Sequence, residues 1–207
     1  MNKYHEENIK AYNKMADNYN STLDGKFTKK FKVLLLENMD INDNDSILDI
    51  GCGNGTLLSK MAKIKKINGF GTDISPQMIK AAKIRHPEHS FIVSGCEKTP
   101  YGDNSMDIIT VCAAYHHFPD VNAFAAEAKR LLKPSGNLYI AEVYFPAITR
   151  NIANIFLPLL KRGDVKFYSH KEIVSTFSTV GFSLVKVVTK GHIQVVQLRE
   201  EHLHLEN

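Results

Sequence analysis

Two aspartates and a run of glycines are the residues of this sequence that best fit a chemical role. Asp49 ends a short apolar segment, and Gly51, Gly53 and Gly55 follow it at alternate positions. Glycines in a tight turn allow unusual backbone angles and the close approach of a ligand. Asp73 ends the next apolar segment, and a carboxylate there can accept hydrogen bonds from the hydroxyls of a ribose. The pattern predicts a pocket for a ligand that contains a nucleoside.

Alternating strands and helices would position these residues. Short apolar runs typical of buried strands lie at 46–50, 69–73, 91–93, 107–112 and 137–143. Segments of helical periodicity separate most of them. Because crossovers of this length join parallel strands, we expect an α/β sheet covered by helices on both faces. In such sheets ligands bind at the carboxyl ends of the strands, where the glycines and both aspartates lie.

The two ends of the chain depart from this alternation. Apolar residues three or four apart over 9–19 predict a first helix, which we expect Asp24-Gly25 to end, and 27–35 predicts a second helix. Near the other end, 183–188 and 192–198 have the pattern of two strands joined by a short connection. Such a connection requires antiparallel pairing. The predicted sheet is therefore mostly parallel, with an antiparallel strand near its end.

The glycine spacing distinguishes two kinds of nucleotide site. The dinucleotide fingerprint G-x-G-x-x-G places its last glycine where this chain has Thr56, one residue after Gly55. Asp49 would also repel a pyrophosphate at close range, whereas it suits a ligand with an amino group. The spacing therefore disfavours an NAD-dependent oxidoreductase.

Four motifs, in order, resemble those of class I S-adenosylmethionine-dependent methyltransferases. They are ILDIGCGNG from Ile47, TDISPQMIKAAK from Thr72, SGCEKTPYGDNSMDIITVCAAYHHF from Ser94, and LLKPSGNLYIAEV from Leu131. The chain is most similar to the branch that includes the ubiquinone and menaquinone methyltransferases. The resemblance implies a seven-stranded Rossmann-like sheet of order 3-2-1-4-5-7-6 with strand 7 antiparallel. It also implies methyl transfer from S-adenosylmethionine to a small-molecule acceptor by in-line displacement, with S-adenosylhomocysteine as the product.

The same resemblance assigns the cofactor site by position. Gly51 and Gly53 would lie against the methionine part of the cofactor, with Asp49 near its amino group. Asp73 would bind the ribose, and Ile74 would pack on the adenine.

Three further segments complete the expected cofactor site. They supply Tyr12 and Tyr19 in an N-terminal segment, Gly95, Cys96 and Glu97 beside the adenine, and Val111, Cys112 and Ala113 below the sulfonium. Aromatic residues at helical spacing can also serve packing alone, so both interpretations of the two tyrosines stay open. Gly95 stands where the family usually has the acidic residue that accepts a hydrogen bond from the adenine amino group.

The histidine pair His116-His117 follows the fourth strand, where an acceptor would meet the methyl group. A histidine there could act as a general base, and the alternative is a polar pair at a junction between a loop and a helix. The remaining histidines are scattered and form no ligand set, so no metal site is predicted.

Composition excludes several classes of protein. The apolar fraction of 43% and the charged fraction of 23% are those of globular chains, and no apolar run approaches the ~18 residues of a membrane span. The net charge of +4 is too diffuse to indicate a nucleic-acid partner. Three widely spaced cysteines and an N-terminus without an apolar export stretch predict a reduced, cytoplasmic protein without stable membrane insertion. The sequence does not indicate an oligomeric state.

We therefore expect a single methyltransferase domain over 1–207, with a helical lid at 1–40 and a cap over the acceptor site at 144–168. Aromatic residues in the cap suggest a partly apolar acceptor site. The alternatives are a module that binds S-adenosylmethionine or S-adenosylhomocysteine without chemistry and, less favoured, an NAD-dependent oxidoreductase. The sequence does not specify the acceptor.

Overall fold

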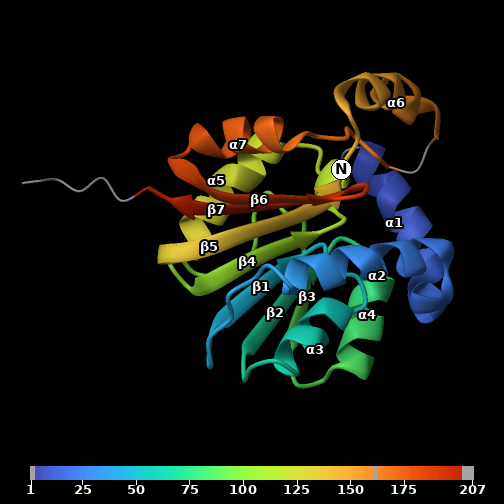
Figure 1. Ribbon diagram of the computed structural model, residues 1–207. Coiled ribbons are helices and arrows are strands. Elements are labelled where there is room, and N and C mark those ends of the chain that lie inside the picture. The colour runs from blue at the N-terminus through green and yellow to red at the C-terminus, as the bar shows by residue number, and fades with distance from the viewer. Residues whose placement is uncertain (1–2, 161–162, 202–207) are drawn as a thin grey trace, which may run out of the picture.

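The computed structural model describes residues 3–160 and 163–201 and contains one seven-stranded sheet between helices (Figure 1). The strands are β1 Ser46–Ile50, β2 Asn68–Asp73, β3 Ser90–Val93, β4 Met106–Cys112, β5 Leu132–Val143, β6 Phe182–Lys190 and β7 Ile193–Glu200. The helices are α1 Lys3–Met15, α2 Leu23–Leu36, α3 Thr56–Ala62, α4 Pro76–Arg85, α5 Val121–Leu131, α6 Ala147–Leu160 and α7 His170–Ser178, with the short 3₁₀ helices η1 Ala16–Ser21 and η2 Tyr115–His117.

The strand order is β3-β2-β1-β4-β5-β7-β6. β7 runs antiparallel to both of its neighbours, and all the other pairs are parallel. This order and the single antiparallel strand confirm the fold predicted from the sequence. Because the order reverses between β1 and β4, the crossovers diverge there and leave room for a ligand at the carboxyl ends of these strands.

The central strands β1, β4 and β5 are buried on both faces, as a parallel sheet requires. On one face α5 and α7 pack on alternate residues of β1 and β4, among them Leu48 and Ile109. On the other face α2, α3 and α4 pack on the neighbouring residues, among them Ile47 and Ile108. Residues that alternate along one strand therefore belong to two different hydrophobic clusters, which fixes the register of the strand that carries Asp49. No helix of the described residues is both long enough and apolar enough to cross a membrane.

The N-terminal segment departs from the prediction. Asp24 and Gly25 lie inside α2, so the prediction that this pair ends the first helix is wrong. The break falls at Thr22, whose hydroxyl donates to the Tyr19 carbonyl (2.7 Å) and accepts from the Gly25 N–H (3.0 Å). A Cβ at position 25 would lie 1.9 Å from the Tyr19 carbonyl oxygen. The glycine is needed for this close contact between η1 and α2, and not to end a helix.

β5 begins at Leu132, earlier than the predicted strand at 137–143. Its pairing with β4 is irregular at this point, because Met106 pairs with Leu132 whereas Ile108 pairs with Asn137. Residues 132–136, ahead of the predicted strand, are therefore an irregular part of β5. Ser169 and Glu172 form a capping box at the start of α7: the Ser169 hydroxyl accepts from the Glu172 N–H, and the Glu172 carboxylate accepts from the Ser169 N–H.

We predict that Gly25→Ala destabilises the protein by about 1–3 kcal/mol, because the new methyl group forces η1 away from α2. Gly102→Ala is the matched control, since a Cβ at 102 meets nothing within 4 Å. Urea unfolding of both variants measures the difference. Equal stability of the two variants would show that the η1–α2 junction adjusts without cost.

Candidate functional site

A pocket lies at the carboxyl ends of β1, β2 and β4. The predicted site residues that line it are Tyr12, Tyr19, Asp49, Gly51, Gly53, Asp73, Ile74, Cys96, Cys112, Ala113 and His117. Gly95, Glu97, Val111 and His116 were also predicted for the site but do not line this pocket. Residues that are far apart in the sequence, from position 12 to position 117, therefore line one pocket.

The glycine loop is held to the end of β2 by its backbone. The N–H groups of Gly51 and Cys52 both donate to the Thr72 carbonyl, at 2.8 and 2.9 Å. Gly51, Gly53 and Gly55 all have positive φ, which favours glycine. A Cβ on Gly51 would lie 2.6 Å from the Cβ of Ala114, whereas a Cβ on Gly53 would meet nothing within 4 Å. Gly53 therefore leaves its backbone open to the pocket.

Asp73 shapes the loop as well as lining the pocket. One carboxylate oxygen accepts from the Gly53 N–H (2.9 Å), and the other accepts from the Ser75 N–H (2.8 Å). Burial raises the pKa of Asp73 although both hydrogen bonds act to lower it. Each oxygen keeps a second lone pair, so the carboxylate can still accept from ligand hydroxyls.

Asp49 is almost fully buried at the end of β1 and accepts a hydrogen bond from the Thr110 hydroxyl at 2.8 Å. Burial raises its pKa to about 7, against the opposing effects of the Thr110 hydrogen bond and the charge of Lys32. A positively charged ligand group would stabilise the ionised Asp49 carboxylate, because it offsets the free-energy cost of burying the negative charge.

The N-terminal segment contacts the loop that follows each of the first four strands. The contacts join Asn20 to Asn54 (3.0 Å), Asn13 to Ser75 (2.7 Å), His5 to Glu97 (3.4 Å) and Tyr12 to His117 (2.9 Å). Figure 1 shows α1 standing at that end of the sheet. The pocket is therefore walled on one side by residues that precede the sheet in sequence.

The residues that follow β3 and those at the end of β4 differ in how they contribute to the pocket. A Cβ on Gly95 would lie 2.6 Å from an oxygen of the Glu97 carboxylate, so an acidic group already stands beside this position. Val111 is fully buried in the hydrophobic cluster under α5 and α7. Cys112 and Ala113 follow it and line the pocket, and Ala113 has a positive φ of 54°. Such a conformation is uncommon outside glycine and is typical of functional sites.

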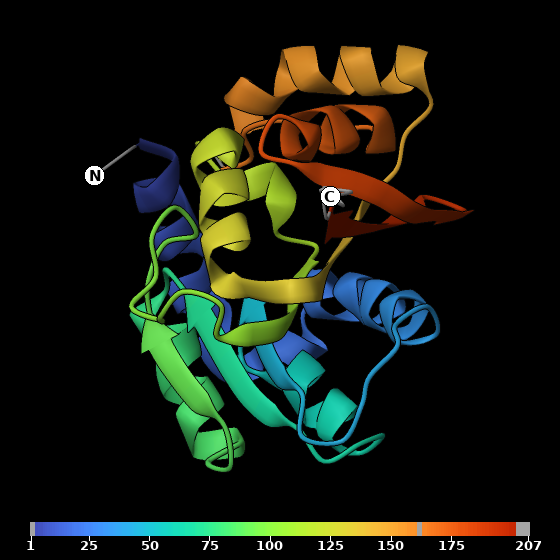
Figure 2. The ribbon, with the colours of Figure 1, turned by 90° about the vertical axis from the view of Figure 1, so that its left-hand side faces the viewer.

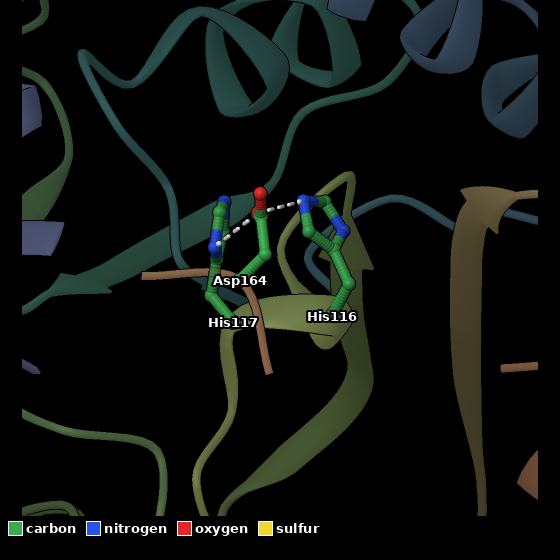
Figure 3. A group of neighbouring side chains, drawn as sticks. All are labelled: His116, His117 and Asp164. Atoms are coloured by element: carbon green, nitrogen blue, oxygen red, sulfur yellow. Dashed lines mark ion pairs between the residues drawn. The ribbon is translucent and has the colours of Figure 1, made fainter. Parts of the chain in front are cut away.

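The histidine pair belongs to a network of buried polar groups. His116 Nδ1 lies 2.8 Å from an oxygen of Glu142, which is fully buried on β5. The Tyr12 hydroxyl shares a hydrogen bond with His117 Nε2, and Asp164 Oδ1 lies 3.5 Å from His116 Nε2 and 3.1 Å from His117 Nδ1 (Figure 3). The sequence analysis did not select Glu142 or Asp164. A glutamate in an otherwise apolar strand was a signal for Glu142, but nothing local distinguishes Asp164.

The pKa values of the two histidines shift in opposite directions. Burial lowers the pKa of His116, but the carboxylates of Glu142 and Asp164 outweigh burial and the net shift is upward. Burial and the neighbouring His116 lower the pKa of His117, which is therefore a neutral ring at neutral pH.

The segment 144–168 contributes less to the pocket than the sequence suggested. None of its aromatic side chains lines the pocket: Phe145 and Phe167 pack on each other, and Phe156 is exposed on α6. In both views α6 lies outside the layers formed by the sheet and its covering helices (Figure 2). Residues 161–162 of this segment lie outside the described residues.

Comparisons with known proteins agree with this geometry. Residues 48–140 match the family described as a methyltransferase domain. A demethylmenaquinone methyltransferase of Chlorobaculum parvum is 36% identical over 139 residues, which are 66% of this chain and 54% of that protein. An uncharacterised methyltransferase of Synechocystis is 25% identical over 83% of both chains. Over about two thirds of its length the chain is therefore similar to methyltransferases.

The solved structures support the fold of the chain. A chain from a Haloferax volcanii complex between a methyltransferase activator and a methyltransferase has a TM-score of 0.82 at 20% identity, over 92% of this chain and 98% of that chain. A methyltransferase of Aquifex aeolicus has a TM-score of 0.66 at 20% identity, over 87% of this chain and all of that chain. Among sequence relatives, the similarity is to demethylmenaquinone and ubiquinone/menaquinone methyltransferases, and the chain spans about half the length of those relatives.

The raised pKa of Asp49 makes a prediction about stability. Its pKa is 3.8 in the unfolded chain and about 7 in the folded one, so the unfolded state binds fewer protons between these values. The carboxylate therefore costs stability as the pH rises from about 4 to 7, and this cost remains above 7. We predict that Asp49→Asn stabilises the protein by about 1–3 kcal/mol at pH 8 and changes little at pH 4.

Denaturant unfolding of Asp49→Asn at both pH values tests this prediction. The control is Asp17→Asn on η1, where the aspartate is exposed and should contribute within ±0.5 kcal/mol at either pH. A variant at position 49 that is less stable than the natural protein at pH 8 would contradict it.

Proposed function

We propose that this protein transfers a methyl group from S-adenosylmethionine to a small-molecule acceptor. The observation that carries the proposal is the placement of Asp49, Gly53 and Asp73 around one pocket. A buried carboxylate suits the ammonium group of the cofactor, an open glycine backbone admits its close approach, and a second carboxylate suits its ribose. These three chemical features together match S-adenosylmethionine better than a dinucleotide.

The remaining lining residues extend the proposed cofactor site. Ile74 would pack on the adenine, while Cys112 and Ala113 would lie below the sulfonium. Glu97 stands beside Gly95, the position where the family usually has an acidic residue, and would place an acidic side chain near the adenine edge. A carboxylate placed two residues later in the chain could thus offset the one that Gly95 lacks.

S-adenosylmethionine supplies a methyl group on a sulfonium, which is already an activated leaving group. The task of the protein is to hold the acceptor in line with that methyl group and to exclude water. We place the acceptor on the side of the pocket lined by Tyr12, Tyr19 and His117. The hydrogen bond between Tyr12 and His117 fixes the positions of both polar groups on this wall.

The proposal includes a lid formed by residues 1–40. The contacts of the N-terminal segment with the loops after β1, β2, β3 and β4 support this lid. Because the segment forms one side of the pocket, it must move for a ligand to enter. The printed names of relatives include demethylmenaquinone and ubiquinone methyltransferases. For this chain we propose a small-molecule acceptor without assigning a quinone.

Asp73→Ala should weaken S-adenosylhomocysteine binding by about 1–3 kcal/mol, because the variant loses charge-assisted hydrogen bonds to the ribose. Since Asp73 also shapes the glycine loop, calorimetric titration should be repeated with the 2′-deoxy analogue of the ligand. If Asp73 binds the ribose, the substitution costs less affinity for the analogue. An equal loss for both ligands would limit Asp73 to a role in the loop.

Gly53→Leu should reduce S-adenosylhomocysteine binding at least tenfold, since its side chain would project into the open pocket. Gly191→Leu is the matched control, because Gly191 also has a positive φ and open space but lies in the β6–β7 turn. Both variants should lose similar stability, and only Gly53→Leu should lose binding. Equal affinity of the two variants would contradict the close approach of the ligand.

Activity is tested by incubating the protein with S-adenosylmethionine and a panel of quinols, phenols, amines and small acids. We expect S-adenosylhomocysteine formation that depends on an acceptor and disappears in Gly53→Leu but not in Gly191→Leu. Tight cofactor binding without transfer to any acceptor would favour the non-catalytic binding module.

A further inference from the structure

The side chains of His116, His117 and Asp164 form a group that the methyl-transfer site does not require. Each residue offers one ligand atom, and these atoms all lie within 4.8 Å of one another. Figure 3 shows Asp164 between the two imidazole rings, although it comes from the segment between α6 and α7. We propose that this group binds a divalent transition-metal ion of the zinc class at the edge of the pocket.

The separations fit a metal ion with little movement. Histidine nitrogen and carboxylate oxygen bind Zn²⁺ at about 2.0–2.2 Å, so two ligands in tetrahedral geometry lie ~3.4 Å apart. Asp164 Oδ1 lies 3.5 Å from His116 Nε2 and 3.1 Å from His117 Nδ1. Two of the three separations are therefore already close to the spacing that a bound ion would impose, and the third, between the two histidine nitrogens, would close from at most 4.8 Å.

Both histidines have the outer partners that metal-binding histidines require. Glu142 accepts from His116 Nδ1 at 2.8 Å, which leaves Nε2 with its lone pair toward Asp164. Tyr12 can accept from His117 Nε2 at 2.9 Å, which leaves the Nδ1 lone pair toward Asp164. Nδ1 also lies 3.4 Å from the Gly163 carbonyl oxygen, and a bound ion would replace this contact. Such hydrogen bonds fix the tautomer and the orientation of a ligating ring. Two nitrogens and one oxygen favour Zn²⁺ or a similar ion over Mg²⁺ and Ca²⁺, which prefer oxygen ligands.

Burial and charge also favour a cation here. The three side chains are only 11–13% exposed, and Glu142 is fully buried beside them. Two nearby carboxylates in such surroundings require a positive partner. A proton on His116 can supply this positive charge, and a metal ion can supply it in place of the proton. The experiment must therefore distinguish an ion from a proton.

The ion would lie at the acceptor side of the pocket, because His117 and its partner Tyr12 both line it. Three protein ligands leave a coordination position that an oxygen atom of the acceptor can occupy. This role rests on the proposed function, whereas the metal site itself does not. The acceptor class that fits is a small molecule with a hydroxyl or enolate oxygen.

Calorimetric titration of the EDTA-treated protein with Zn²⁺, without S-adenosylmethionine, tests the site. We expect one ion per chain, at least tenfold weaker binding in Asp164→Asn, and weaker binding in Glu142→Gln. The matched control is Glu88→Gln, which removes a carboxylate from a second, looser histidine pair. Glu88 Oε1 lies 3.8 Å from His86 Nδ1 and 3.7 Å from His89 Nε2. Absence of binding to the natural protein, or equal weakening in Asp164→Asn and Glu88→Gln, would overturn the proposal.

A measurement on the natural protein guards against misfolded variants. Addition of Zn²⁺ should shift the NMR signals of the His116 Nε2 and His117 Nδ1 ring nitrogens, and Co²⁺ should give visible absorption bands. Unchanged signals from both rings at saturating Zn²⁺ would overturn the site. S-adenosylhomocysteine binding is measured in a separate titration, so failure of the metal site and failure of the proposed function are distinguishable.

Discussion

The rest of the site depends on the hydrogen bonds between the glycine loop after β1 and the end of β2. One carbonyl, that of Thr72, accepts from two successive N–H groups of the glycine loop, and the Asp73 carboxylate accepts from a third at Gly53. Gly51, Gly53 and Gly55 of this loop have positive φ angles. The same bonds orient the Gly53 backbone toward the pocket and hold the Asp73 carboxylate at its rim. Loop shape and ligand recognition therefore rest on the same atoms.

This arrangement buries charge that the free protein does not fully neutralise. The pKa values of Asp49 and Asp73 are both raised, with burial as the largest cause. Such carboxylates lower the stability of the folded state at neutral pH, and a cationic, hydroxyl-bearing ligand relieves part of that cost. A site of this kind is expected to be less stable when it is empty, because its polar groups are arranged for a ligand and not for one another.

The sequence predicted the parts of the site that local patterns encode. Asp49, Gly53 and Asp73 were found because each ends a strand or forms a turn, and the positions of strand ends follow from alternation and from the motifs. The helix break at Asp24-Gly25 was predicted wrongly, since a glycine that serves a close contact with Tyr19 looks like a helix breaker in sequence. Asp164 and the lining role of Lys32 could not be predicted, because long-range packing places them and no spacing relates them to the glycine loop.

The part of the pocket wall formed by Asn8, Tyr12 and His117 lies where three distant segments meet. Asn8 of α1 donates to the Gly163 carbonyl at 3.2 Å, and a Cβ on Gly163 would overlap the Asn8 amide. His116 accepts through its carbonyl from the Val165 N–H at 2.7 Å. The segment that carries Asp164 is therefore fixed from two sides, by α1 and by η2, and Tyr12 of α1 also contacts His117. A displacement of α1 that opens the pocket would break contacts to both Gly163 and His117, so access to the pocket and the geometry around Asp164 are mechanically linked.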